Sequence, residues 1–240
     1  CEAVARFRVT CPDGRVVTSS LPLHVSDSLL VAEKEIALAP DGEKVFLWDE
    51  FHPDLYTVEC TLCPVNDSSS AHVVKTTFGM RSVGRDAHHI MVNGHRVHLR
   101  GTVENAVFPK IGHAPVEDAP WERIMGIVKS YGMNHMRFHS WCPPDAAFRA
   151  ADKAGVYLEI EMPMWGKDAL PDERRYDFFR REIRAILKEY GNHPSFLLYC
   201  NGNEIQGNFD FIEELTSTAE KLDSRHLYSG STARTRIPSD

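Results

Sequence analysis

The sequence lacks three features that would each assign it to a broad class of protein. It has no run of about 18 apolar residues, so it encodes no membrane-spanning helix. It has fewer basic residues than acidic ones, 27 against 34, and the net charge of −7 argues against a nucleic-acid-binding surface. The first ten residues, CEAVARFRVT, have no apolar signal core, so we expect a targeting segment to be absent or already removed. Cytoplasmic, periplasmic and secreted locations all stay open.

Cysteine is too sparse for a disulfide scaffold, with six in 240 residues. Cys60 and Cys63 form a C-x-x-C pair, but no second pair or nearby histidine set accompanies them. They also lie in an alternating, strand-like run, so we interpret them as structural in preference to a zinc or redox site. No H-E-x-x-H or comparable spacing supports a metal elsewhere, and we expect no cofactor.

The chain is long enough for one large domain or two unequal ones, and its composition, 42% apolar and 25% charged, is typical of a globular protein. Its character changes near residue 90. Before that point, short segments rich in β-formers alternate with turn clusters, which is typical of an antiparallel sandwich. We expect a β-sandwich over residues 1–87, incomplete at its N-terminus because it begins inside a strand, and a second domain over 88–240. Asn93-Gly94 predicts a tight hairpin at the junction.

After residue 95 the pattern alternates between strands and helices. Strands are predicted over 98–104, 134–140, 156–162, 196–200 and 227–231, with helices over 120–131, 144–155, 179–190 and 212–222. This alternation implies a parallel sheet with helical crossovers, either an open doubly wound sheet or part of an eight-stranded barrel. No glycine-rich nucleotide loop follows any strand, and the polar content of the strands favours the barrel.

Charged side chains recur on one face of three successive predicted strands. Because side chains alternate along a strand, Glu159 and Glu161 share the face opposite an apolar one. In the preceding strand Arg137 and His139 share a face in the same way, and in the first strand Arg100, Thr102 and Glu104 do so. Unpaired buried charge is costly, so these groups should neutralise one another on the inner side of the sheet. We predict that Arg137 pairs with Glu159 or with a neighbouring inward carboxylate.

Barrel active sites lie at the carboxyl ends of the strands, where this sequence has a set of polar and aromatic residues. They are Glu104 and Asn105, His139 and Trp141, Glu161 and Trp165, and Asn203 with Glu204. Glu204 closely follows the apolar run FLLYC, where partial burial would suit a general acid. Asn203 can donate a hydrogen bond to a substrate hydroxyl, and the tryptophans offer flat faces on which a pyranose ring could stack.

Each of these candidates has an alternative role. On position alone, Glu204 fits the N-cap region of the following helix equally well. Glu104 and Glu161 fit ion-pair or substrate-hydroxyl partners better than proton-transfer groups. A metal-dependent hydrolase that uses His139 with Glu104 or Glu161 is the least favoured scheme, because the ligand spacing is absent.

Five stretches of the sequence, in order, carry a family resemblance: LWDEFHPDLYTVECTL, FGMRSVG, VNGHRVHLRGTVEN, YGMNHMRFHS and NHPSFLLYCNGNE. They run from about residue 46 to residue 204, and the ordered series is much more specific than any single motif. The series resembles glycoside hydrolase family 2, the family of β-galactosidases, β-glucuronidases and β-mannosidases. The resemblance implies an immunoglobulin-like sandwich followed by the first part of a (β/α)₈ barrel. It also implies an exo-acting, retaining hydrolase of O-glycosidic bonds with a carbohydrate substrate.

The family pattern implies roles for four residues. Glu204 corresponds to the general acid/base, and Asn203 to a contact with the sugar beside the scissile bond. Arg100 and Arg137 match the inward arginines of the family's barrel.

The chain departs from the family pattern at two places. Many members have His-Glu after the first barrel strand, where this chain has Glu104-Asn105. Many have Ser-His-Tyr-Pro after the second strand, where this chain has HSWCP from His139 onward. We therefore expect an unusual sugar-binding surface, and the sequence leaves the sugar and the linkage open.

Glycoside hydrolysis normally uses two carboxylates. The resemblance puts the nucleophile on the seventh barrel strand, whereas this chain ends near the fifth. We therefore expect a fragment that is inactive by itself, with an open sheet edge that favours a homo-oligomer or edge pairing. The alternative hypothesis is a non-catalytic carbohydrate-binding or scaffold protein, because a fold does not fix a function.

Overall fold

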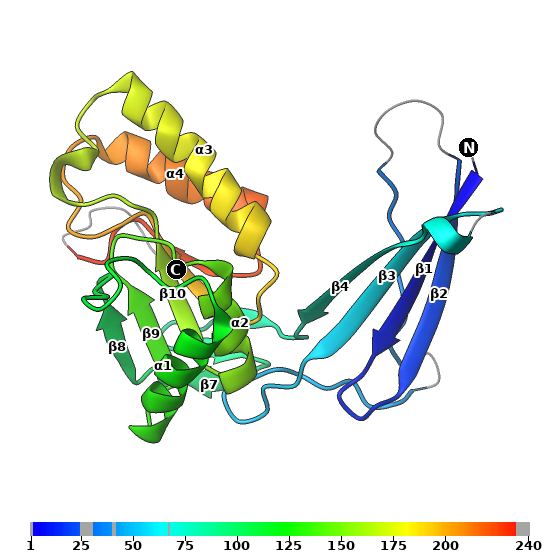
Figure 1. The fold of residues 1–240 in the computed structure, drawn as a ribbon. Helices are drawn as coiled ribbons and strands as arrows, with labels where there is room; N and C mark the ends of the chain where they lie inside the picture. The colour runs from blue at the N-terminus through cyan, green and yellow to red at the C-terminus, as the bar shows by residue number, and fades with distance from the viewer. Residues whose placement is uncertain (1, 25–30, 40–41, 67, 234–240) are drawn as a thin grey trace. The chain divides into compact units, whose positions relative to one another are not determined.

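The computed structural model describes residues 2–24, 31–39, 42–66 and 68–233, and the chain divides into two compact units (Figure 1). The first unit comprises Cys1–Leu47 and Asp54–Met80, and the second comprises Trp48–Pro53 and Arg81–Asp240. The predicted order, antiparallel sheet first and parallel sheet with helices second, is confirmed. Within the described ranges, no helix combines the length and the apolar character needed to cross a bilayer.

The first unit is built on a four-stranded antiparallel sheet with the order β2-β1-β3-β4. Its strands are β1 (Glu2–Thr10), β2 (Val16–His24), β3 (Tyr56–Pro64) and β4 (His72–Phe78), with the 3₁₀ turn η1 (Ser68–Ser70) before β4. Side chains alternate between the two faces, so that Ala5 and Val9 are buried while Arg6 and Arg8 are exposed. The apolar face packs around the fully buried ring of Tyr56.

A three-stranded antiparallel sheet with the order β5-β6-β7 belongs to the second unit. Its strands are β5 (Val83–Arg85), β6 (Ile90–Val92) and β7 (His95–Val97). Asn93 and Gly94 join β6 to β7 with φ angles of 53° and 77°. Two successive positive φ angles are those of a type I′ turn, which Asn and Gly tolerate. The predicted hairpin at Asn93-Gly94 is thus confirmed.

The centre of the second unit is a five-stranded parallel sheet with the order β12-β11-β10-β9-β8. Its strands are β8 (Gly101–Glu104), β9 (His135–Phe138), β10 (Tyr157–Glu161), β11 (Phe196–Cys200) and β12 (Leu227–Ser229). The crossover helices are α1 (Asp118–Ser130), α2 (Asp145–Ala154), α3 (Glu173–Tyr190) and α4 (Phe209–Leu222), with the 3₁₀ turn η2 (Gly166–Asp168) after β10. Every strand and helix predicted after residue 95 is therefore present.

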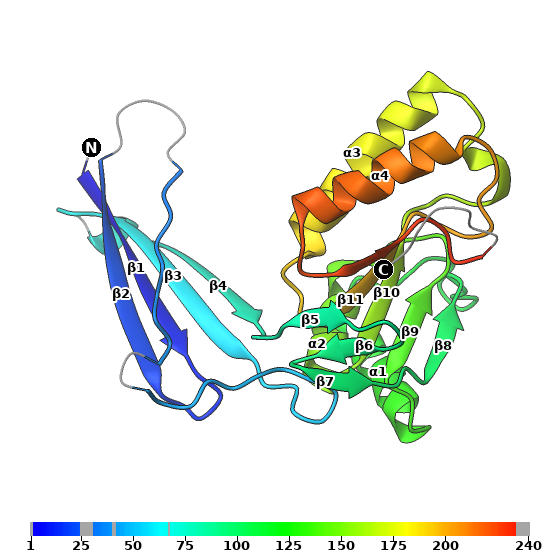
Figure 2. The ribbon, with the colours of Figure 1, turned by 180° about the vertical axis from the view of Figure 1, so that it is seen from behind.

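The alternation along each strand decides which face meets the helices. In β10, Leu158 and Ile160 are fully buried, while Glu159 lies on the opposite face. Helix α3 turns Phe179 and Ile183 toward the core and leaves its charged residues outside. Figures 1 and 2 show α1 and α2 on one side of the parallel sheet and the small sheet β5–β7 on the other. The charged inner face therefore lies on the side of β5–β7.

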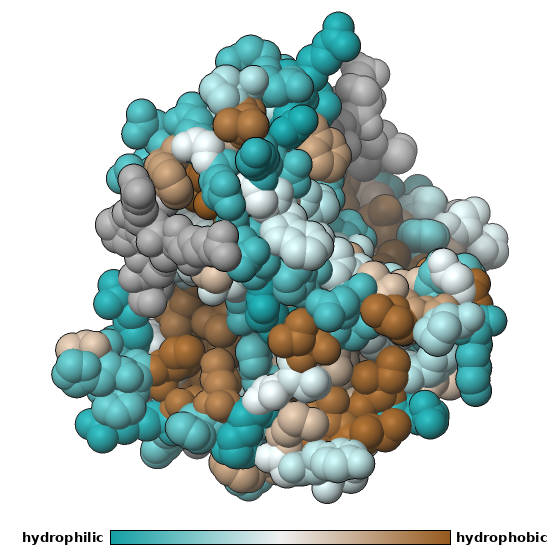
Figure 3. Space-filling model, turned by 90° about the vertical axis from the view of Figure 1, so that its left-hand side faces the viewer, coloured by the Kyte–Doolittle hydropathy of each residue, from teal (hydrophilic) through white to brown (hydrophobic). Residues whose placement is uncertain are grey.

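The parallel sheet has open edges in the part of the chain that the structure describes, because β8 and β12 each pair with one neighbour. Figure 3 views the molecule from the β8 side and shows brown apolar side chains gathered in hollows between hydrophilic ones. In the loop after β8, Val107 and Ile111 are 68% and 52% exposed. The predicted open edge is thus present, and exposed apolar side chains lie in the loop beside it.

Candidate active site

The carboxyl ends of β8, β9, β10 and β11 lie at one edge of the parallel sheet, because neighbouring parallel strands run in register. The residues predicted for catalysis and substrate binding all lie at or just beyond these ends: Glu104, Asn105, His139, Trp141, Glu161, Trp165, Asn203 and Glu204. Arg100 does not join them. It precedes β8 at the opposite edge, where its Nη2 donates to Glu50 Oε2 at 2.9 Å.

Arg137 is the centre of a polar network at the carboxyl edge. Its Nε donates to Glu161 Oε1 at 2.6 Å, which confirms the predicted pairing with an inward carboxylate. Its Nη2 donates to Asn203 Oδ1 at 2.9 Å and to Thr232 Oγ1 at 2.7 Å. Since the arginine holds the Oδ1 atom of Asn203, the Nδ2 donor of that amide is turned away from the arginine.

Glu161 is an anchor for this network. Its side chain is completely buried, and its second oxygen, Oε2, accepts a hydrogen bond from the backbone N–H of Ser140. Both oxygens therefore have a partner within the protein. This arrangement favours the ion-pair role for Glu161 over a proton-transfer role.

Glu104 also has a role within the protein, but the prediction that it lies on the inner face is wrong: it pairs in register with Phe138, which is buried on the helix side. Its carboxylate accepts from the backbone N–H groups of Ala106 at 2.8 Å and Val107 at 3.2 Å. Its backbone oxygen accepts from Trp141 Nε1 at 3.3 Å. Glu104 thus shapes the turn after β8 and holds one of the two tryptophans in place.

Backbone strain is concentrated at the ends of three strands. Among the described non-glycine residues, φ is positive at Asn93 in the hairpin and at Ala106, Ser140 and Glu204, where it is 56°, 57° and 50°. The last three follow β8, β9 and β11. Strain of this kind costs on the order of 1–3 kcal/mol per residue and persists where function or packing enforces it. Its clustering is an independent indication of a site at this edge.

Close backbone contact ties the loop after β11 to the loop after β10. Gly202 has a φ of 149°, and a Cβ atom at this position would collide with the carbonyl oxygen of Met164. The close approach lets the N–H of Asn203 donate to that oxygen at 3.1 Å. Asn203 and Trp165 form an isolated parallel bridge as a result. The loop that carries Asn203 and Glu204 therefore lies beside the loop that carries Trp165.

An open cavity of about 600 Å³ lies at the same edge. Its walls are Val103, Asn105, Ala106, Arg137, His139, Ser140, Trp141 and Trp165. The rings of His139 and Trp165 meet edge to face with centroids 4.9 Å apart, and Trp165 is 56% exposed. An exposed aromatic face beside fixed polar groups suits a sugar, because the ring C–H groups can stack while the hydroxyls form hydrogen bonds.

Glu204 is half-buried in the loop after β11. The alternative that it caps the next helix is wrong. Helix α4 begins at Phe209, and its N-cap is Asn208, whose Oδ1 accepts from the N–H of Phe211 at 3.2 Å. Glu204 therefore belongs to the strained loop and not to the helix end.

Glu159 and His135 lie one step further along the inner face, toward the amino ends of the strands. Glu159 Oε1 is 3.7 Å from Arg137 Nε, and Glu159 Oε2 is 3.8 Å from His135 Nε2. Burial, and then the charge of Glu161, raises the pKa of Glu159 to about 7, although Arg137 opposes the shift. Burial, and then the charge of Arg137, lowers the pKa of His135 to about 4.

Two members of the site are not identifiable from sequence patterns. Thr232 lies 95 positions from Arg137 and reaches it only because the segment after β12 folds back over the sheet edge. Ser140 adopts a left-handed backbone conformation that its residue type does not signal. The position of Ser140, directly after a strand end that carries His139, is the one available clue.

Several curated proteins match the chain, and two of them have names that denote glycosidases. No family profile matches the chain. It is 28% identical over 204 residues to a "Putative beta-glucuronidase" of Formosa agariphila, which covers 77% of this chain and 24% of that protein. It is 26% identical over 211 residues to a β-galactosidase of Thermoanaerobacter pseudethanolicus, which covers 87% and 27%. The chain thus spans about a quarter of the length of these relatives.

Solved structures share the fold. A β-glucuronidase of Parabacteroides merdae superposes with a TM-score of 0.77 at 24% identity, over 95% of this chain and 29% of that one. A glycosyl hydrolase family 2 member from Bacteroides cellulosilyticus gives a TM-score of 0.75 at 20% identity, over 95% and 30%. Together with the sequence relatives, these matches confirm the predicted resemblance to glycoside hydrolase family 2.

Proposed function

We propose that this chain forms part of an exo-acting glycoside hydrolase of the family 2 type, with Glu204 as its general acid/base. One observation carries the proposal. The strained loop with Glu204, the oriented amide of Asn203 and a cavity lined by aromatic residues all lie at one edge of the parallel sheet. The relatives named β-glucuronidase and β-galactosidase support the reaction class. On this proposal the partner is a carbohydrate.

Glu204 acts on the glycosidic oxygen in this scheme. Its carboxylic acid donates a proton to the leaving oxygen as the bond to the anomeric carbon breaks. Its carboxylate then takes a proton from the water that attacks in the second step of a retaining reaction. A half-buried side chain suits both steps, because it is accessible to substrate and water yet partly shielded from solvent.

Asn203 holds the sugar in this scheme. Arg137 occupies its Oδ1 atom, so Nδ2 donates to a hydroxyl next to the scissile bond. The buried ion pair between Arg137 and Glu161 fixes the amide before substrate arrives. Donors that are already oriented need no reorganisation during the reaction, which is the main advantage of such a network. The exposed face of Trp165 supplies the stacking surface.

Retaining hydrolysis needs a second carboxylate about 5–5.5 Å from the first. Two carboxylates at this edge are already held within the protein, Glu161 by Arg137 and Ser140, and Glu104 by its own turn. Because the chain spans only about a quarter of the length of its relatives, we propose that the nucleophile lies outside these 240 positions. On this proposal β8 to β12 are the first part of a (β/α)₈ barrel. The four-stranded sheet of the first unit is one layer of an immunoglobulin-like sandwich, which its antiparallel topology supports.

The test uses the full-length gene product and the Glu204→Gln variant. The substrates are alkyl and 2,4-dinitrophenyl β-galactosides and β-glucuronides. We expect turnover of the alkyl glycosides to fall about 10²–10⁴-fold, because their leaving group needs the proton. The kcat/KM for the dinitrophenyl glycosides should fall much less, because kcat/KM reports the step in which dinitrophenolate leaves, and this leaving group needs no proton.

Glu213→Gln is the matched control, since it removes an exposed carboxylate from α4, and it should leave both activities unchanged. Normal turnover of alkyl glycosides by Glu204→Gln would contradict the assigned role. A wild-type protein that binds these sugars and hydrolyses none of them would favour the carbohydrate-binding alternative.

A further inference from the structure

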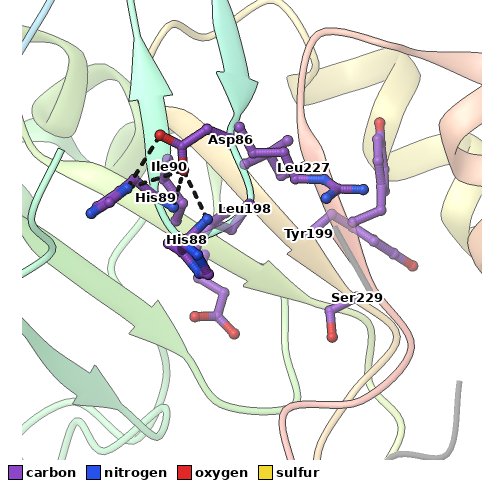
Figure 4. A pocket seen from close by; sticks show the side chains of 12 residues that line it. Asp86, His88, His89, Ile90, Leu198, Tyr199, Leu227 and Ser229 are labelled. Carbon is purple, nitrogen blue, oxygen red and sulfur yellow. Dashed lines mark hydrogen bonds and ion pairs between the residues drawn. The ribbon is translucent and has the colours of Figure 1, made fainter. Parts of the chain in front are cut away.

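Glu159 lies between the Arg137 network and a second cavity. This cavity has a volume of about 480 Å³ and lies between the small antiparallel sheet and the parallel sheet (Figure 4). Asp86 and His88 line it from one side, and Leu198 and Glu159 line it from the other. The Glu159 side chain is 15% exposed, so it can exchange a proton with water in this cavity.

Arg137 has two carboxylates near a single N–H group. Its Nε is 2.6 Å from Glu161 Oε1 but 3.7 Å from Glu159 Oε1, so only Glu161 receives the hydrogen bond. If both glutamates are ionised, this buried cluster has one negative charge in excess. If Glu159 is protonated, the charges of Arg137 and Glu161 balance. Because uncompensated buried charge is costly, the proton on Glu159 determines whether the charges around Arg137 balance.

Protonated Glu159 has a potential hydrogen-bond acceptor on the neighbouring strand β9, the Nε2 atom of His135. His135 Nε2 is buried and has no hydrogen-bond partner among the described residues. It lies 3.8 Å from Glu159 Oε2, so a small rotation of the carboxyl group would bring its O–H within hydrogen-bond distance. The remaining titratable and charged groups around Glu159 are Arg137, Glu161, Cys200, Arg85, Asp86, His88, His89, Tyr199 and Tyr228.

We propose that Glu159 is a pH-dependent positioning residue, whose loss of a proton draws the Arg137 guanidinium away from Glu161 and thereby shifts the amide of Asn203. The effect on catalysis rests on the proposed function, but the switch itself is a property of the folded chain. Burial and the charge of Glu161 raise the pKa of Glu159 to about 7, so the switch operates near neutral pH. His135 stays neutral there, because its pKa is lowered to about 4.

The test is an NMR titration of the whole chain that follows the Glu159 carboxyl carbon and the Arg137 Nε–H group between about pH 5 and pH 9. We expect both signals to change with the same midpoint, near pH 7. In Glu159→Gln the Arg137 transition should disappear, while in the exposed-site control Glu213→Gln it should persist. An Arg137 signal that stays constant while Glu159 titrates overturns the proposal, and so does an unchanged Arg137 transition in Glu159→Gln.

The wild-type titration decides the matter even if Glu159→Gln does not fold. In the full-length gene product, the switch further predicts that the wild-type pH profile of kcat/KM has an inflection near pH 7 that Glu159→Gln lacks. An absence of any hydrolysis by the wild type would count against the proposed function alone. The NMR result would then still decide whether Glu159 moves Arg137.

Discussion

The Nε atom of Arg137 lies 2.6 Å from Oε1 of Glu161, and the glutamate side chain is fully buried. This ion pair joins β9 to β10 beneath the candidate site. Replacing Arg137 with methionine keeps much of the side-chain volume but leaves a carboxylate without its cation. We expect the free energy of unfolding of the second unit to fall by about 3–5 kcal/mol, as measured by urea unfolding.

The matched control is Arg180→Met, which breaks the exposed ion pair between Arg180 and Glu214. Their atoms are 2.7 Å apart, but the side chains are 38% and 47% exposed. Exposed pairs contribute less than about 1 kcal/mol, because solvent screens the charges. Equal losses for Arg137→Met and Arg180→Met would contradict the view that burial gives the Arg137 pair its importance.

Gly101 allows β8 to pack against a histidine side chain. A Cβ atom at Gly101 would collide with Nδ1 of His135, whose ring is buried and has little room to move. We expect Gly101→Ala to destabilise the protein by about 1–3 kcal/mol through overpacking. Gly126→Ala makes a useful contrast, because Gly126 lies on the exposed face of α1 with no atom within 4 Å of the added Cβ.

In Gly126→Ala we expect a gain of about 0.5–1 kcal/mol, since alanine loses less backbone entropy than glycine in a helix. The two variants should therefore shift the thermal midpoint in opposite directions. A shift of the same sign for both would show that the contact between Gly101 and His135 is not tight.

Sequence periodicity was enough to locate the parallel sheet, because buried parallel strands are apolar runs between amphipathic helices. The predicted strand 196–200 coincides with β11 (Phe196–Cys200). The predicted strand 98–104 is too long, since β8 begins only at Gly101. The reason is a side chain: Asn134 Oδ1 accepts from the N–H of Arg100, and its Nδ2 donates to the carbonyl of His98. The Asn134 side chain thus takes the hydrogen bonds that a neighbouring strand would otherwise make, and the pattern of apolar residues in the sequence does not reveal this.

The sequence predicted those contacts of the candidate site that depend on the alternation of side chains along a strand and on the burial of charge. The pairing of Arg137 with an inward carboxylate follows from charge balance on one face of the sheet. The choice between a catalytic and a capping position for Glu204 could not be made, because helix starts are uncertain by several residues from sequence and Asn208 is an equally good cap. The sequence could not predict that Thr232 belongs to the site, since its contact with Arg137 depends on tertiary packing.

His135 and Glu159 should affect the pH dependence of stability in opposite directions. Burial lowers the pKa of His135 from 6.5 to about 4. Between these values the unfolded chain binds a proton that the folded chain does not, so stability rises with pH. Burial raises the pKa of Glu159 from 4.5 to about 7. Between those values the folded chain binds the extra proton, so stability falls as pH rises.

In the wild type the two contributions offset each other between about pH 4.5 and 6.5, where both pKa shifts operate. His135→Gln removes the rising contribution, and Glu159→Gln removes the falling one. Since one pKa unit corresponds to about 1.4 kcal/mol, each variant should change the stability difference between pH 5 and pH 6.5 by about 2 kcal/mol. Urea unfolding at these two pH values measures the difference. The free energy of unfolding of His135→Gln should fall as pH rises, and that of Glu159→Gln should rise. The same pH dependence in both variants would mean that neither group is buried in the folded protein.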